Sequence, residues 1–335
     1  MIGIGVIGTG RIGRIHVTNL MRQVEGATVV AVADPFVDEA REWLEPLGVP
    51  KIHKEYRGVL SDPEVDAVYV CSSTDTHAQI VTEAAAAGKH IFCEKPIDLE
   101  IPRVRDALEK VDQAGVTMMV GFNRRFDHNF ATLRSAITAG EIGDIHLVKI
   151  TSRDPAPPPI DYVKVSGGLF LDMTIHDFDM VRFLSGSEVA AVSAAGTVLV
   201  SDEIRAVGDI DTAIVTLWFE NGAIGVIDNS RQAVYGYDQR AEVFGSKGMV
   251  QIENDTESRV IRTTAEGPRG DKPLWFFLER YAEAYARESA AFVKALHEGA
   301  SPPTTGVDGL APMLIGAAAK KSMEERRVVT IAEVS

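Results

Sequence analysis

The chain has 335 residues, 45% of them hydrophobic and 24% charged, which is the composition of an ordinary soluble protein. This length exceeds that of a typical single core, so two domains are expected. The formal net charge of −14 argues against nucleic acid or an anionic membrane as a partner, and it suits a neutral or cationic small ligand better than a polyanion.

The two cysteines and the apolar runs bear on the compartment. Cys71 and Cys93 lack the spacing of metal ligands and form no disulfide framework, which favours a reducing setting. No apolar run has the length of a membrane span, and the first residues lack the basic segment and cleavage site of a signal peptide. We therefore expect a cytoplasmic protein without a membrane partner.

Over the first part of the chain, buried strands alternate with helices. This alternation predicts an α/β domain with a doubly wound parallel sheet, spanning residues 1–122. The strands are expected at 2–7, 27–33, 66–70, 89–93 and 116–120, and the helices from the first Gly-rich turn to about 25, near 37–47, at 76–87 and at 99–113.

The pattern changes beyond residue 122. Alternating strands and a strong hairpin signal at Asn221-Gly222 predict an α+β domain over 123–335, with a largely antiparallel open sheet. Strands are expected near 143–152, at 211–219 and 223–229, on both sides of Gly245–Gly248, and at 327–331; helices are expected at 124–139, 170–184, 274–298 and 306–325.

Strand 211–219 has no charged residue on either side within 212–219. Such a strand could lie in a two-sided core within one chain, or it could turn one face toward a second subunit. The residues leave these alternatives open.

Three glycines, Gly8, Gly10 and Gly13, match G-x-G-x-x-G between the first expected strand and a helix. In this context the first glycine allows a tight turn, the second lets the backbone approach a pyrophosphate, and the third lets helix and strand pack closely. Asp34 ends the next strand, where a carboxylate would accept hydrogen bonds from ribose hydroxyls. Because that carboxylate also repels a 2′-phosphate, the sequence predicts NAD rather than NADP as the cofactor.

Polar residues follow two further strands of the expected parallel sheet. Residues 72–77 (SSTDTH) and 94–96 (EKP) stand at the carboxyl ends of their strands, where ligands bind in open α/β sheets. Pro96 restricts the backbone of Lys95, so the lysine side chain is expected to be aimed more reproducibly than in a flexible loop.

The segment 170–184 (FLDMTIHDFDMVRFL) is apolar nearly all round, yet it carries Asp172, His176 and Asp179. On a helical wheel these three side chains fall within about 60° of one another. They either satisfy one another in a core or face a wet cleft. No third ligand or cysteine cluster accompanies Asp172 and His176, so no metal site is expected.

With these pieces assembled, the chain resembles the glucose–fructose oxidoreductase/inositol dehydrogenase (Gfo/Idh/MocA) family along nearly its whole length. The resemblance is carried by GTGRIGRIH, STDTH, EKP, GFNRRFD (121–127), GGLFLDMTIHDFDMVRFL (167–184) and NSRQAVYGYDQRAEVFGSKG (229–248). GFNRRFD, SRDP (152–155) and YGYDQRAEVFGSKG look closest to inositol 2-dehydrogenases.

The resemblance implies roles for individual residues. Lys95, Asp172 and His176 would act at the reacting hydroxyl. Apart from the resemblance, we expect Asp179 to make a hydrogen bond behind them or an interdomain contact. Members of the family form oligomers, often tetramers, through the open sheet. The implied cofactor-binding residues are Gly8, Gly10, Arg11, Ile12, Gly13, Asp34, Ser73, Thr74, His77, Glu94 and Lys95, and the implied substrate-binding residues are Arg125, Asp154 and Tyr235.

The expected function is NAD-dependent oxidation of a cyclitol hydroxyl, with myo-inositol as the substrate and its 2-keto form as the product. Some inositol dehydrogenases carry His-Arg-Asn-Pro where this chain has Ser152-Arg153-Asp154-Pro155, which leaves another inositol isomer or an aldose as an alternative. A third alternative is a sensor of the same fold that binds the nucleotide without turnover.

Overall fold

The computed structural model describes residues 1–335, which form two compact units. The first unit comprises residues 1–126 and 283–311, and the second comprises 127–282 and 312–335. This division differs from the expected boundary at 122/123 because a late helix belongs to the first unit. That helix, α12 (Ala282–Glu298), buries Phe292 and Val293 in the apolar cluster of the first unit.

The first unit is built on a six-stranded sheet in which every pair is parallel, in the order β3-β2-β1-β4-β5-β6. The expected doubly wound parallel sheet is thus confirmed, and β3 is a strand that the sequence pattern did not reveal. The strands are β1 (Ile2–Ile7), β2 (Ala27–Ala33), β3 (Lys51–His53), β4 (Ala67–Val70), β5 (His90–Glu94) and β6 (Met118–Gly121).

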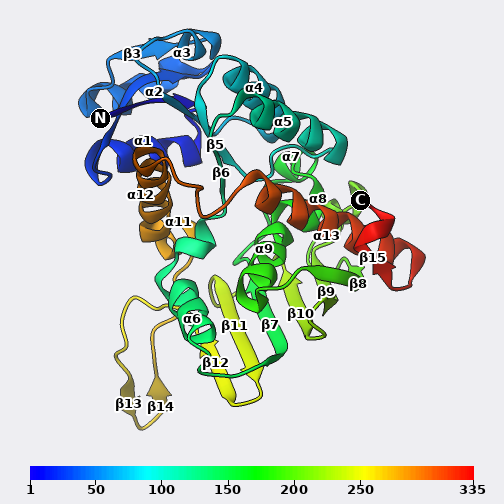
Figure 1. Cartoon of the computed structure of the whole chain (residues 1–335). Helices are drawn as coiled ribbons and strands as arrows, with labels where there is room; N and C mark the ends of the chain where they lie inside the picture. The colour runs from blue at the N-terminus through cyan, green and yellow to red at the C-terminus, as the bar shows by residue number, and fades with distance from the viewer. The chain divides into compact units, whose positions relative to one another are not determined.

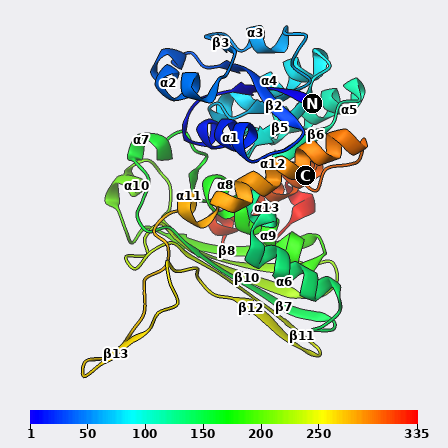
Figure 2. The same cartoon turned by 90° about the vertical axis from the view of Figure 1, so that its left-hand side faces the viewer.

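Helices cover both faces of this sheet. On one face α1, α2 and α12 share a single apolar cluster with β1 and β2, and α4 packs beside α5 on the other face (Figures 1 and 2). The apolar residues of the strands are almost fully buried, as expected for a parallel sheet. The remaining elements are α1 (Arg11–Arg22), α2 (Val37–Leu44), η1 (Glu45–Leu47), α3 (Arg57–Leu60), α4 (Thr74–Ala86), α5 (Ile101–Ala114) and η2 (Asn123–Phe126).

The second unit contains a seven-stranded sheet in the order β12-β11-β7-β10-β9-β8-β15. All of its pairs are antiparallel except β7 with β10, so the expected largely antiparallel sheet is confirmed. The strands are β7 (Ile145–Arg153), β8 (Val189–Thr197), β9 (Thr212–Phe219), β10 (Ile224–Ser230), β11 (Asp238–Gly245), β12 (Gly248–Ile252) and β15 (Val329–Thr330).

Helices cover one face of this second sheet. Figure 2 shows the sheet nearly edge-on, with α6, α8 and α9 on the same side. The covering segment over 168–185 is two helices rather than the single one expected. They are separated at Met173, whose φ of −101° departs from the value of a regular helix while its ψ of −59° stays in the helical range. The helices are α6 (His128–Thr138), α7 (Ile160–Val163), α8 (Gly168–Asp172), α9 (Thr174–Ser185), α10 (Asp202–Ala206), α11 (Phe277–Arg280), α13 (Gly306–Glu325) and η3 (Ile331–Glu333).

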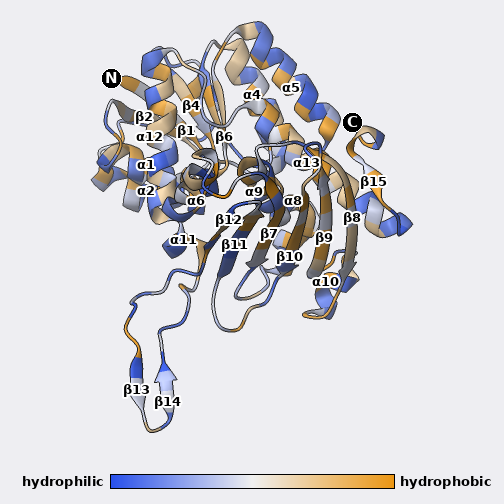
Figure 3. Cartoon of the chain, turned by 60° about the horizontal axis from the view of Figure 1, so that its bottom comes forward, coloured by the Kyte–Doolittle hydropathy of each residue, from blue (hydrophilic) through white to orange (hydrophobic).

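The other face of the sheet stays exposed within the chain. Along β9, Ala213, Val215 and Leu217 are buried, while Ile214 is 46% and Trp218 37% exposed. The alternation excludes the two-sided core within one chain. In Figure 3 β11 is largely hydrophilic, whereas β8 and β9 carry hydrophobic residues.

A two-stranded hairpin extends from the second unit (Figure 3). It consists of β13 (Arg262–Thr264) and β14 (Gly267–Arg269), which pair antiparallel. No helix of the chain is both long and apolar enough to cross a bilayer.

Candidate functional site

The Gly-rich turn of the first unit has the geometry that a dinucleotide requires. Gly8 has φ +98°, and a side chain there would lie 2.5 Å from the carbonyl oxygen of Cys71. A side chain on Gly13 would meet the Gly8 carbonyl oxygen at 2.0 Å, so α1 packs directly on the turn. A side chain on Gly10 would meet nothing within 4 Å, which leaves the backbone open to a ligand.

Asp34 is fixed against this turn. One of its carboxylate oxygens accepts a hydrogen bond from the Thr9 backbone N–H at 2.7 Å, and the other accepts from the Phe36 N–H at 2.8 Å. The turn also opens α1, whose first residues, Arg11 and Ile12, stand at a helix N-terminus that favours an anion. These residues therefore fit a pyrophosphate on the helix and a ribose at Asp34.

The two other strand-end segments are joined by His77. The imidazole of His77 is buried, with Nδ1 2.8 Å from the Pro96 carbonyl oxygen and Nε2 3.0 Å from the Ser72 carbonyl oxygen. Both ring nitrogens are thus used by the backbone, and His77 holds the segment after β4 against the one after β5. Ser73 and Thr74 begin α4 at the end of the first segment.

Glu94 is the last residue of β5 and Lys95 follows it, and both are partly buried. Glu94 Oε1 lies 2.7 Å from Nε2 of the buried His16, and Nε2 lies 3.9 Å from Oε1 of Glu288. His16, Glu94 and Glu288 offer one nitrogen and two oxygens within 4.8 Å of one another. Burial, and then the charge of Glu94, raise the pKa of the Glu288 carboxyl well above its ordinary value, which favours its protonated form.

Asp172 and His176 lie on the helices that cover the second sheet. Asp172 is the last residue of α8, and His176 lies in the first turn of α9. The backbone N–H of His176 donates to the Met173 carbonyl oxygen, with a nitrogen–oxygen distance of 3.3 Å. The break at Met173 means that the ideal wheel does not describe the two side chains, although they remain one turn apart.

The carboxylate of Asp172 has a donor on each oxygen. The Tyr162 hydroxyl donates to Oδ1 at 2.8 Å, and the Arg231 guanidinium donates to Oδ2 through Nη1 at 3.0 Å. Neither partner was expected from the sequence. Their positions, 10 residues before and 59 residues after Asp172, leave no local signal.

Asp179, the third polar side chain expected on the same side of this segment, does not share the environment of Asp172. Asp179 is 1% exposed and lies 4.0 Å from the Arg182 guanidinium. Sequence reasoning also overlooked Asp177, which is fully buried and accepts a hydrogen bond from the Asn229 amide at 2.8 Å. Because Asn229 lies on β10, this contact ties α9 to the covered face of the sheet.

The three expected substrate residues lie in different surroundings. Arg125, in the first unit, donates to Asp308 Oδ1 at 2.8 Å. Asp154 follows β7, and its backbone N–H donates to the Ser230 carbonyl oxygen at 2.9 Å. Tyr235 lies in the loop between β10 and β11.

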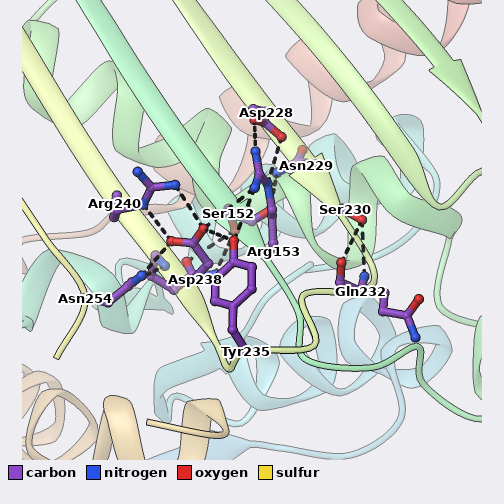
Figure 4. Close-up of polar contacts among 11 residues, drawn as sticks. Ser152, Arg153, Asp228, Asn229, Ser230, Gln232, Tyr235, Asp238, Arg240 and Asn254 are labelled. Atoms are coloured by element: carbon purple, nitrogen blue, oxygen red, sulfur yellow. Dashed lines mark hydrogen bonds and ion pairs between the residues drawn. The ribbon is translucent and has the colours of Figure 1, made fainter. Parts of the chain in front are cut away.

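The hydroxyl of Tyr235 belongs to an ionic network on the exposed side of the sheet (Figure 4). Tyr235 donates to Asp238 at 2.6 Å and accepts from Arg153 at 3.2 Å, and Arg153 also pairs with Asp228. Asp238 is held below its ordinary pKa: burial opposes this, but hydrogen bonds from Arg240 and Tyr235 outweigh it. The structure thus places Tyr235 on the face opposite α9, apart from Asp172 and His176.

Comparisons with known proteins identify both halves of the chain. Residues 2–122 match the family model described as oxidoreductase family, NAD-binding Rossmann fold, and residues 130–251 match the GFO/IDH/MocA C-terminal domain. The chain is 53% identical over 331 residues to a myo-inositol 2-dehydrogenase of Thermotoga maritima, covering 99% of both chains.

Two further relatives cover almost all of the chain. An inositol 2-dehydrogenase of Rhizobium meliloti is 45% identical over 328 residues, or 98% of both chains. The crystal structure of a scyllo-inositol dehydrogenase from Lactobacillus casei, with bound NAD(H) and scyllo-inositol, is similar at a TM-score of 0.91 and 31% identity, covering 99% of each chain.

Proposed function

The chain belongs to the GFO/IDH/MocA family of oxidoreductases, and from this premise we propose that it is an NAD-dependent inositol 2-dehydrogenase that converts myo-inositol to its 2-keto form. One observation supports this more than any other: the same chain carries a dinucleotide turn backed by Asp34 and, four residues before His176, an Asp172 carboxylate held by the Arg231 guanidinium. The first feature suits NAD, and the second suits removal of a hydroxyl proton.

The cofactor is held by the first unit. Backbone N–H groups at the start of α1 bind the pyrophosphate, and Asp34, oriented by the Thr9 N–H, accepts from the ribose hydroxyls. Ser73, Thr74 and His77 belong to the segment after β4, where His77 acts by fixing the loop. When bound, NAD accepts the hydride that leaves the substrate carbon, so the protein needs to supply only positioning and proton transfer.

Proton transfer falls to His176. An alcohol is barely ionised at neutral pH, and imidazole titrates near that pH, so His176 suits the general base that takes the hydroxyl proton. Asp172 holds the ring in one tautomer and orientation. The ammonium of Lys95 hydrogen-bonds the reacting oxygen and stabilises the negative charge that develops on it. Arg125 and Asp154 remain our candidates for substrate contacts, whereas Tyr235, on the face opposite α9, does not.

Substrate choice is proposed from the relatives and from the chemistry of a polyol site. The relative at 53% identity is a myo-inositol enzyme, whereas the scyllo-inositol enzyme is 31% identical. A site that hydrogen-bonds several ring hydroxyls discriminates strongly against an analogue that leaves some of its polar groups unpaired. We therefore rank myo-inositol above scyllo-inositol, and both above glucose.

We further propose a homo-oligomer, with a tetramer as the preferred state. The support is the exposed apolar surface of the second sheet, where Ile214, Trp218, Ile224, Phe244 and Met249 are each between 37% and 48% exposed. Apolar surface of this kind is typical of subunit interfaces.

The test is the formation of NADH, followed by absorbance, with myo-inositol, scyllo-inositol, other inositols and glucose. The expected result is the highest kcat/KM for myo-inositol. A higher kcat/KM for scyllo-inositol or glucose would show that this compound is the preferred substrate, while the proposed NAD-dependent oxidation would stand. Binding of NAD without turnover of any polyol would instead favour the sensor.

A further inference from the structure

The Arg231 guanidinium is fully buried, although arginine is among the residues least often found inside proteins. Burying a charge without a counter-charge destabilises the folded state by several kcal/mol, so we examined which groups neutralise this guanidinium. Nη1 bonds Asp172 at 3.0 Å, and Nη2 lies 3.8 Å from Oδ2 of Asp209. Nε and Nη2 make no hydrogen bond, so the guanidinium is hydrogen-bonded to Asp172 through Nη1 and only ion-paired with Asp209.

The backbone around Arg231 is itself anchored. Its N–H donates to the Asp211 carbonyl oxygen at 2.8 Å. The carboxylate of Asp211 accepts from three successive backbone N–H groups, those of residues 199–201. Asp209 in turn accepts from the N–H of Leu169, in the same short helix as Asp172. Arg231 therefore presents its charge to Asp172 from a rigid loop.

Tyr162 approaches Asp172 from a different element, α7. Its ring is 48% exposed, and its hydroxyl bonds Oδ1 at 2.8 Å, whereas Arg231 bonds Oδ2. Because each oxygen of the Asp172 carboxylate accepts from a different donor, the orientation of the carboxylate plane is fixed. An ionised carboxylate offers about four acceptor positions, so it retains the capacity to accept another donor.

We propose that Tyr162 and Arg231 are positioning residues of the oxidation, which clamp the Asp172 carboxylate in one orientation so that it can hold the His176 ring. The inference rests on the proposed function, since it gives a role to the supports of Asp172 in that reaction. A purely structural role would fasten α7 and the Arg231 loop to α8 and would appear in stability rather than in turnover.

The decisive variant is Tyr162→Phe, because it removes one hydroxyl from a half-exposed ring and leaves the packing in place. We expect kcat with myo-inositol to fall about 10- to 150-fold, the effect of losing a hydrogen bond to a charged group. The KM and the dissociation constant of NAD should stay within about twofold, since the dinucleotide turn is untouched.

Tyr56→Phe is the matched control. The Tyr56 hydroxyl also donates to a carboxylate, that of Glu83 at 3.0 Å, and it lies in the first unit. This variant should keep the parental kcat. Similar thermal midpoints for both variants would exclude unfolding as the cause of any difference between them.

A double-mutant cycle separates positioning from other effects. In an Asp172→Asn background, Tyr162→Phe should change kcat by less than about twofold. Arg231→Lys keeps the charge and should recover more activity than Arg231→Met. If the Arg231 variants do not fold, the Tyr162 cycle alone decides.

Parental kcat in Tyr162→Phe would overturn the inference, and so would an undiminished effect of this change in the Asp172→Asn background. Failure of the proposed function is recognised separately, because the unmodified enzyme would then oxidise no inositol. In that case the proposed role of Tyr162 and Arg231 would be wrong as well.

Discussion

His16 on α1 lies 2.7 Å from the carboxylate of Glu94 at the end of β5, through its Nε2 atom, and its Nδ1 lies 3.2 Å from the Ser289 hydroxyl on α12. The rings of Tyr69, Phe92 and Tyr285 surround the imidazole at centroid distances of 5.0 to 5.8 Å. The residue before Lys95 is thus held from the interior of the first unit by His16, whose other ring nitrogen contacts a helix that comes late in the chain.

Glu288 on the same late helix predicts a pH-dependent stability. Its folded pKa is raised by burial and by the charge of Glu94, while an unfolded glutamate titrates near 4.3. The folded state therefore binds the extra proton, and the stabilisation is complete below about pH 4.3 and is lost as the pH rises toward the folded pKa. Glu288→Gln stays neutral, so between about pH 5 and 8 its melting temperature should fall less than that of the parent.

The control for this experiment is Glu283→Gln, an exposed change on the same helix that breaks a pair with Arg287. Its melting temperature should follow the parent across the pH range. Parallel curves for the parent and Glu288→Gln would contradict a protonated Glu288.

Replacing Asp34 should weaken the cofactor preference. Asp34→Ser removes the acceptor for the Thr9 N–H, which is also the carboxylate that we propose binds the ribose. We expect kcat/KM for NAD to fall and the ratio of NADP to NAD efficiency to rise, because the repulsion of a 2′-phosphate is gone. Asp66→Ser, which removes an acceptor for the Gly3 N–H, should leave the ratio unchanged. Equal efficiency of the two cofactors in the parent would refute the role of Asp34.

Removing the base should affect turnover and leave the cofactor in place. His176→Ala should lower kcat by roughly 10²- to 10⁴-fold, the usual contribution of a positioned acid–base group. The affinity for NAD, measured by fluorescence titration, should change little. His146→Ala, an exposed histidine on β7, serves as the control. Near-normal kcat at pH 7 in folded His176→Ala would show that another group takes the proton.

The exposed face of the second sheet should govern assembly. Light scattering at micromolar concentration should give the mass of a tetramer for the parent. Trp218→Glu should reduce that mass, since it places a charge in the apolar surface of β9. Leu199→Glu, at a position 76% exposed outside the strands, should not. A monomeric parent would remove the basis of this prediction.

The sequence alone determined those features that depend on local spacing. The glycines at 8, 10 and 13, placed between a strand and a helix, predict the dinucleotide-binding turn. The alternation of buried strands with helices predicts a parallel sheet. The hairpin at Asn221-Gly222 follows equally from the conformations those two residues permit, and it joins β9 to β10 as expected. The resemblance carried by short motifs supplied the family for the same reason, because each motif is contiguous.

Only the tertiary structure decided which distant residues meet. The placement of α12 in the first unit, the buried Glu288 beside His16, and the donors from Tyr162 and Arg231 on Asp172 join segments between 10 and 272 residues apart. The break at Met173 and the exposure of one face of β9 likewise depend on what the rest of the unit packs against. Such contacts follow from burial and from pairing across the fold, which residue spacing along the chain does not encode.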